Sequence, residues 1–186
     1  MSSGEACISV PRTMPLITNV SVDSTSTTKG VITVKWIRPE VTPNAPAEYR
    51  LFRAEGLTGT SFTQIAKINV NNSGNTADTL FVDKGLNTED LAYNYQLELW
   101  TTQNGVLTKQ DVSESASSVR LGQGAAEPTM IKLDWTANVP WSNASQTHRI
   151  FREDKAKPGS FNRIAEVRVS GTNSFTYTDN GTDTYP

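Results

Sequence analysis

The stretch YRLFRAEG at residues 49–56 places arginines between large apolar residues and ends at a glycine. A similar run, HRIFREDK, returns at residues 148–155, a shift of 99 positions. The same shift superposes Trp36 on Trp135, with no gap in between. Further pairs that agree under it are Ile32/Ile131, Arg53/Arg152, Ile65/Ile164 and Val70/Val169; a shift shorter by three residues then superposes Asp83/Asp179. We therefore interpret the chain as a duplicated unit.

Both copies show the two-residue period of β-strands. GVITVKWI at residues 30–37 places every second side chain, as far as Trp36, on one face, and MIKLDW at residues 130–135 does the same as far as Trp135. In YNYQLELW, residues 93–100, the inward side chains are predicted to be Tyr93, Tyr95, Leu97 and Leu99. No stretch shows the period of an amphipathic helix.

Turn residues separate the predicted strands. Asn104-Gly105 predicts a hairpin turn, because both central residues of such a turn need positive φ. A unit of about 100 residues with about seven short strands and frequent turns is typical of a two-sheet sandwich. The fold class that we expect is therefore all-β, with two sandwiches in tandem.

Composition narrows the functional classes. The formal net charge of −2 and the absence of a basic cluster argue against a nucleic-acid surface. No apolar run approaches the roughly 20 residues that cross a bilayer. Cys7 is the only cysteine, so an intrachain disulfide is excluded.

The repeat divides the chain into three predicted parts. Residues 1–13 are the tail of a preceding repeat or a linker, residues 14–121 form the first unit, and residues 122–186 form the second unit. Aligned on the first unit, the second stops before a counterpart of YNYQLELW, so we expect it to be incomplete and to lack its last two strands. LGQGAAEP at residues 121–128 is predicted to be the linker, with Gly122 as a flexible position.

Two motifs carry a family resemblance. VKWIRP at residues 34–39 resembles the fibronectin type III signature of an inward tryptophan followed by proline. GLNTEDLAYNYQLEL at residues 85–99 is similar to that family's tyrosine corner, with Tyr93 as the corner residue. This resemblance implies immunoglobulin-like sandwiches, and its motifs are scaffold residues that specify no activity.

Three longer stretches narrow the resemblance. Residues 8–36, 49–66 and 116–143 look like tandem sandwiches in large surface proteins of gliding bacteria, which the type IX secretion system exports with a type B sorting region. The resemblance implies an extracellular or cell-surface location. It also implies a role in adhesion or gliding motility.

Few residues invite a catalytic interpretation. His148, the only histidine, aligns with Tyr49 on an inward strand position and is interpreted as structural. Cys7 is interpreted as an incidental thiol, and Asp179–Asp183 as a plain turn in preference to a calcium loop. The arginines of both repeated runs are expected to point outward. We predict no catalytic, cofactor-binding or metal-binding residue, and hence no enzyme and no cofactor.

Two tryptophans are candidates for ligand contact. Trp100 ends a strand on the outward parity, and Trp141 follows the second tryptophan strand in a loop. Exposed aromatic rings at loop ends bind sugars or proteins in many sandwiches. For Trp141 the alternative is local packing on Pro140.

The sequence leads to one functional expectation and one alternative. We expect a non-catalytic extracellular spacer or adhesion segment of a large secreted cell-surface protein, with a protein or a glycan at the cell surface as its partner. The alternative is a set of accessory modules of a secreted carbohydrate-active or proteolytic enzyme, with glycan binding. The incomplete second unit is further expected to share a strand with a second chain or a neighbouring repeat.

Overall fold

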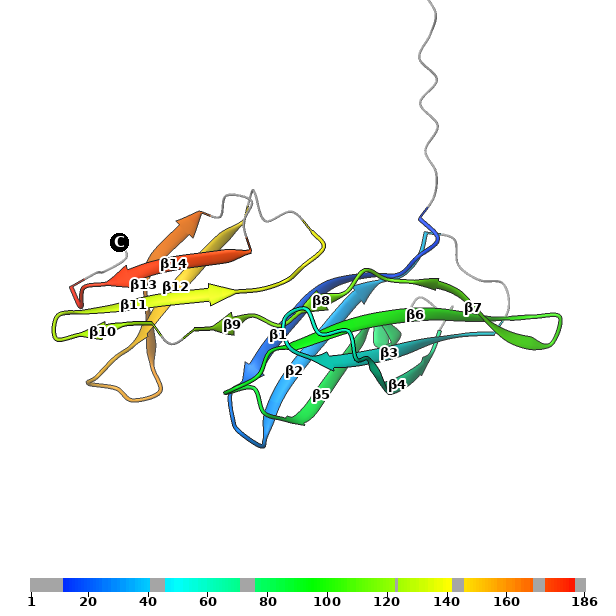
Figure 1. The fold of residues 1–186 in the computed structure, drawn as a ribbon, viewed down its shortest axis with the longest axis horizontal. Helices are drawn as coiled ribbons and strands as arrows, with labels where there is room; N and C mark the ends of the chain where they lie inside the picture. Colours follow the sequence, from blue (N-terminus) through cyan, green and yellow to red (C-terminus); the bar gives the residue numbers. More distant parts are fainter. Residues whose placement is uncertain are drawn as a thin grey trace, which may run out of the picture.

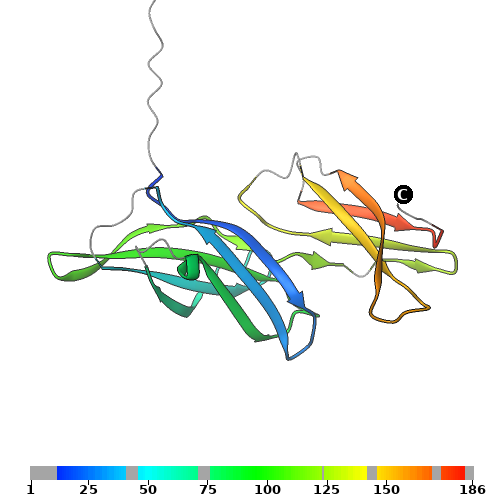
Figure 2. The same cartoon turned by 180° about the vertical axis from the view of Figure 1, so that it is seen from behind.

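The computed structural model describes residues 12–40, 46–70, 76–122, 124–141, 146–168 and 173–182. These residues form antiparallel β-strands and one short 3₁₀ helix, η1 (Thr76–Thr79), and they contain no α-helix. Figures 1 and 2 show two groups of strands next to each other along the long axis, β1 to β8 in one and β9 to β14 in the other. The all-β class predicted from the alternating sequence is confirmed, and the arrangement fits a β-sandwich.

Two sheets form the first unit. The three-stranded sheet has the order β1–β2–β5 and consists of β1 (Leu16–Ser24), β2 (Gly30–Ile37) and β5 (Leu80–Leu86). The five-stranded sheet has the order β4–β3–β6–β7, with β8 beside β6, and consists of β3 (Ala47–Glu55), β4 (Thr63–Asn69), β6 (Tyr93–Gln103), β7 (Val106–Val112) and β8 (Ala116–Ser117).

The inward residues of both sheets meet in one hydrophobic core. Trp36 of β2 lies against Tyr49 of β3, with their rings edge to face and 5.8 Å between centroids. The inward alternation predicted for β6 is confirmed, since four of its side chains are buried: Tyr93, Tyr95, Leu97 and Leu99. Burial of alternate apolar side chains is the main stabilising contribution to such a pair of sheets.

Local predictions for β6 and its turns also hold. Asn104 and Gly105 both have positive φ, at 50° and 80°, and join β6 to β7 as the hairpin signal predicts. The hydroxyl of Tyr93 accepts a hydrogen bond from the backbone N–H of Asn87 at 3.1 Å. That contact is the one expected of a tyrosine corner.

The second unit repeats the first in part. One sheet has the order β10–β11–β14, with β9 also beside β11, and consists of β9 (Arg120–Leu121), β10 (Ala126–Glu127), β11 (Met130–Thr136) and β14 (Ser174–Asp179). The other sheet pairs β12 (Thr147–Glu153) with β13 (Phe161–Arg168). The second core centres on Trp135, Ile150 and Ile164.

The second unit departs from the first at Ile131. On β11 this residue alternates with Leu133 and buried Trp135, yet it is 49% exposed, whereas Ile32 is fully buried. The described residues contain no counterpart of β6 to deepen the core around it. The linker prediction for residues 121–128 is wrong, because β9 and β10 both pair with β11.

The glycines of that segment allow close backbone approach. The backbone N–H of Gly122 donates to the carbonyl of Asp134 at 2.6 Å. A Cβ added at Gly124 would overlap the carbonyl oxygen of Lys132. Gly122 and Gly124 therefore let an interrupted first strand lie against β11, and their role is close packing.

Candidate functional site

Trp100 lies on the outer face of β6 and is covered by its own neighbours. The guanidinium of Arg50 is 3.6 Å from the centroid of its ring, and its Nε1 donates to a Glu98 carboxylate oxygen at 2.8 Å. Such stacking is a cation–π contact. One face of this predicted ligand-contact residue is therefore occupied within the chain.

Trp141 packs against the first unit. It follows β11, yet its half-buried ring is in contact with the first hydrophobic core. The sequence alternative for Trp141 was packing on its neighbour Pro140. The observed contact is with the other unit. The structure places Trp100 and Trp141 in different surroundings, and it records no contact between them.

The two units also meet through backbone hydrogen bonds. The N–H of Ser117 donates to the carbonyl of Asn138 at 2.7 Å, and the N–H of Asn138 donates to the Ser117 hydroxyl at 2.7 Å. Ser117 ends β8, and β9 begins at Arg120. The guanidinium of Arg120 in turn donates to the Glu89 carbonyl at 2.5 Å. The junction, defined here as Ser117, Asn138, Trp141 and Arg120, thus joins consecutive units with little free chain.

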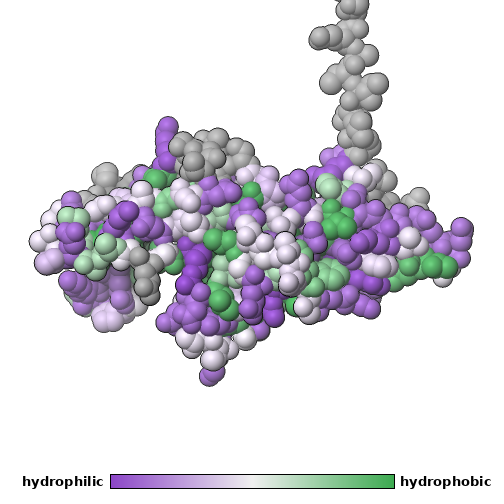
Figure 3. All heavy atoms as spheres, in the orientation of Figure 1, coloured by the Kyte–Doolittle hydropathy of each residue, from purple (hydrophilic) through white to green (hydrophobic). Residues whose placement is uncertain are grey.

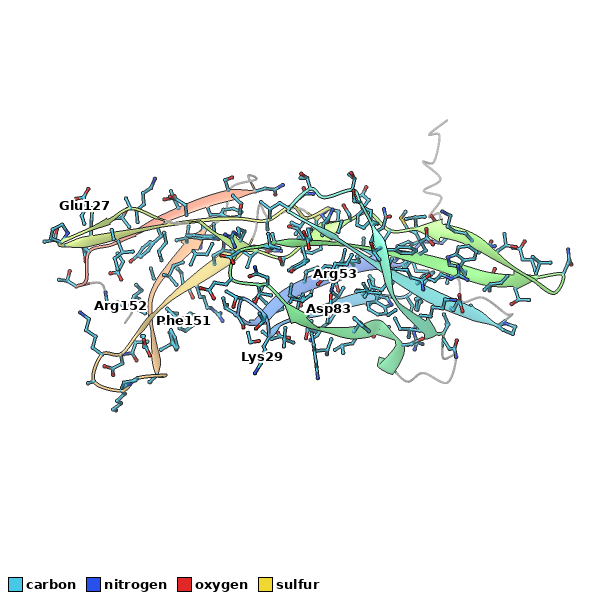
Figure 4. The ribbon with its side chains drawn as sticks, turned by 60° about the horizontal axis from the view of Figure 1, so that its bottom comes forward. Lys29, Arg53, Asp83, Glu127, Phe151 and Arg152 are labelled. Atoms are coloured by element: carbon cyan, nitrogen blue, oxygen red, sulfur yellow. The ribbon has the colours of Figure 1, made fainter. Side chains whose placement is uncertain are left out.

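One ion pair with a buried carboxylate recurs in both units, and Figure 4 labels the partners of its first copy, Arg53 and Asp83. Arg53 donates to both carboxylate oxygens of Asp83, at 3.0 and 2.9 Å, and Asp83 is 6% exposed. The second copy joins Arg152 to Asp179 at 2.6 Å. The expectation that these arginines point outward is therefore wrong. The sequence held a signal for the pair, because both partners recur in the repeat.

Tyr95 completes the first copy of this ion pair. Its hydroxyl donates to Asp83 at 2.9 Å and is itself fully buried. Burial, and then the Asp83 carboxylate, raise the pKa of Tyr95 well above its usual range. The tyrosine therefore stays a neutral donor, and the network ties β6 to β3 and β5.

An aromatic cluster occupies the core of the second unit. The indole N–H of Trp135 donates to Nδ1 of His148 at 2.8 Å, and the His148 ring packs edge to face on Phe175 with centroids 4.6 Å apart. Burial lowers the pKa of His148, because the interior disfavours the charged imidazolium. These contacts confirm the inward position that the alignment of His148 with Tyr49 predicts.

An apolar cavity lies beside β12. Its volume is about 550 Å³. The residues that line it are Val119, Leu121, Leu133, Trp135, Thr147, His148, Arg149, Ile150 and Phe151. Nearby apolar side chains are exposed, with Phe151 at 52% and Leu121 at 59%. Figure 3 shows a surface on which polar and apolar residues are mixed, with a further apolar area at the tip of the β6–β7 hairpin.

The turn after β14 offers a smaller cavity of about 370 Å³, lined in part by Asp179, Asn180 and Gly181. The Asp179 carboxylate already accepts hydrogen bonds from Arg152 and from the backbone N–H of Gly181, at 2.6 and 2.8 Å. Asn180 caps the turn by accepting from the N–H of Thr182. The described part of this turn is therefore an Asx-type turn, and Asp183 and Cys7 lie outside the described residues.

Within the described ranges, no three His, Cys, Asp or Glu side chains gather as a metal site would need. No helix of these residues is long and apolar enough to cross a membrane.

No family model matches the sequence, and none of the curated proteins with which it was compared matches it. The resemblance to fibronectin type III units therefore rests on the motifs alone.

Proposed function

We propose that the chain is a non-catalytic spacer and adhesion segment of a large cell-surface protein, built from consecutive fibronectin type III-like units. Such a segment holds a more distal part of the protein away from the cell. Its partner would be a protein or a glycan at the cell surface.

The contacts at the junction are the observation that supports this proposal. Ser117 and Asn138 exchange two hydrogen bonds of 2.7 Å, and Trp141 of the second unit packs on the core of the first. A linker of only Ser118 and Val119 separates β8 from β9. Short, packed connections restrict the angle between units, which is what a spacer needs and a flexible tether lacks.

A distance measurement tests the spacer role. Spin labels on cysteines at Val106 and Met130, in a Cys7→Ser background, mark the β6–β7 and β10–β11 turns at opposite ends in Figure 1. A stiff spacer gives one narrow distribution of label-to-label distances in a double electron–electron resonance measurement. A broad distribution, as for units that tumble independently, contradicts the proposal.

The alternative, accessory modules of a secreted enzyme, makes a different prediction. A glycosidase or protease domain encoded beside this segment would favour it, whereas further sandwiches and a sorting region would favour the spacer. A glycan array tests direct sugar binding. Binding that is lost in Trp100→Ala would assign the sugar contact to that ring, which either hypothesis allows, so the neighbouring coding sequence decides between them.

A further inference from the structure

Strand β12 pairs along one edge only. Its partner is β13, and no other strand of the described residues bonds to it. Its counterpart β3 pairs with β4 on one edge and with β6 on the other, from Ala47 opposite Thr101 to Glu55 opposite Tyr93. β12 therefore presents a row of backbone N–H and C=O groups to which a further strand can bond.

The cavity of about 550 Å³ lies at the same place as this open edge, since residues 147–151 of β12 line it. In the first unit, β6 covers the matching edge of β3 and contributes buried side chains such as Leu97 to the core. The cavity walls include Leu133 and Trp135, so the side chains best suited to fill the cavity are apolar. Together, the cavity and the open edge of β12 are called the β12 groove.

We propose that the β12 groove binds an extended strand with the apolar alternation of β6. The strand runs antiparallel to β12, bonds to it through the backbone, and places apolar side chains into the cavity at every second position. Its chemistry can be read from β6, because the two units share one register along β3 and β12.

The register specifies side chains as well as hydrophobicity. Leu97 lies opposite Leu51, so an apolar residue is expected opposite the equivalent Ile150. Glu98 lies opposite Arg50, so a carboxylate opposite Arg149 would give that arginine, which is 63% exposed and pairs with Glu166 at 3.3 Å, a second acidic neighbour. Cross-strand pairs of opposite charge stabilise a sheet.

A second copy of the chain fits the groove less well. Paired antiparallel through β12 and centred on Phe151, it would place Glu153 opposite Arg149, so charge alone does not exclude it. Its own β12 side chains are already engaged, however, because Ile150 packs in the core of its unit and His148 accepts from Trp135. A second copy would therefore bond to the edge and leave the cavity unfilled, whereas a strand with the apolar alternation of β6 fills both.

A synthetic peptide tests this proposal on the full chain. The probe is a fluorescent copy of residues 91–103, LAYNYQLELWTTQ, added to the 186-residue protein. We expect saturable binding by anisotropy and slower hydrogen exchange at β12 amides, with exchange at β3 unchanged. The same peptide with Leu97→Lys should bind at least about ten-fold more weakly, because a lysine in the cavity is costly to desolvate.

A protein variant gives an independent check. Val119 lines the groove but is 45% exposed, so Val119→Lys should leave the melting temperature of the protein nearly unchanged. The same substitution should lower the affinity for the peptide by about ten-fold or more, because it places a charge at the apolar groove. The control is Val106→Lys, at a 64% exposed valine on the first unit, which should bind like the unchanged chain.

Three results would overturn the proposal. The first is a peptide affinity that neither Leu97→Lys nor Val119→Lys lowers. The second is slowed exchange at β3, which would mean that the peptide displaces β6. The third is slow hydrogen exchange at the β12 amides without peptide, together with a dimer whose population rises with protein concentration. That result would mean that a second copy of the chain occupies the groove.

Discussion

Trp36 and Trp135 hold equivalent positions in the two units but differ in their hydrogen bonding. Nε1 of Trp36 is buried without a hydrogen-bond partner, whereas Nε1 of Trp135 donates to His148. A buried N–H without an acceptor costs about 1–3 kcal/mol. The replacement of Tyr49 by histidine at position 148 supplies that acceptor in the second unit.

This hydrogen bond makes the second unit sensitive to acid. His148 accepts through Nδ1, and protonation would turn that atom into a donor. Because burial lowers the folded-state pKa of His148, the unfolded chain binds the proton more readily. Stability should be full above the unfolded pKa of about 6.5 and should fall as the pH drops below it.

Thermal melts between about pH 5 and 8 measure this effect. His148→Tyr, which restores the residue found at position 49, should remove the pH dependence of the second unit. An equal decline in acid for both proteins would assign the effect to other groups.

The ion pair of Arg53 and Asp83 ties three strands of the first unit together. Asp83→Asn should lower the free energy of unfolding by about 2 kcal/mol, because Arg53 and Tyr95 lose the charged acceptor that they share. Chemical denaturation measures the change. Lys109→Gln removes a partner of Glu98 that is 49% exposed, and it should cost less than about 0.5 kcal/mol. Similar losses for both variants would contradict this explanation.

At the scale of elements, the first strand of the second unit is split into β9 and β10. Both pieces pair with β11, and the segment between them stays close enough for Gly122 to donate to Asp134. Composition alone made this segment resemble a linker. Two glycines in a strand edge serve close backbone approach as readily as flexibility.

Gly124→Ala tests the difference. Its Cβ would overlap the Lys132 carbonyl, so β10 must move away from β11, and we expect a loss of about 1–3 kcal/mol in the second unit. Gly122→Ala is the matched control, since its Cβ would lie 3.2 Å from the nearest atom, the Asp134 carbonyl oxygen, and should cost less. Denaturant titrations compare them. A flexible linker would tolerate both substitutions equally.

At the scale of the whole molecule, the two cores differ in size. Among the described residues, the first core contains 12 buried side chains and the second contains three. Each additional buried large apolar side chain contributes about 1.5–3 kcal/mol. The second unit therefore has much the smaller hydrophobic stabilisation.

Calorimetry of the full chain should consequently show two transitions. The lower one belongs to the second unit and should rise in temperature when a strand fills the β12 groove. Hydrogen exchange identifies which unit opens first. A single cooperative transition would mean that the junction couples both cores completely.

Trp141 is the residue through which the junction can be loosened. Trp141→Ala removes the aromatic contact with the first core and should broaden the distance distribution between labels at positions 106 and 130. Trp100→Ala is the control, because that ring contacts Arg50 and Glu98 within the first unit. Equal broadening of the distance distribution in both variants would mean that Trp141 does not stabilise the junction.

Local sequence patterns were enough to predict the strands and most of their inward faces. The alternation of Trp36, the run from Tyr93 to Leu99 and the Asn104-Gly105 turn are local signals, because strand periodicity and turn φ depend on neighbouring residues. The repeat further showed that the arginine of Arg53 and Arg152, and the aspartate of Asp83 and Asp179, recur at equivalent positions.

Which of these residues contact each other depends on the three-dimensional arrangement of the sheets. The pairing of Arg53 with Asp83 and the packing of Trp141 on the first unit both join segments far apart in the chain. The edge of β12 that no other described strand covers likewise follows from the arrangement of the strands. Such contacts depend on how two sheets face each other. A two-residue period states which side a residue faces and leaves open what lies opposite it.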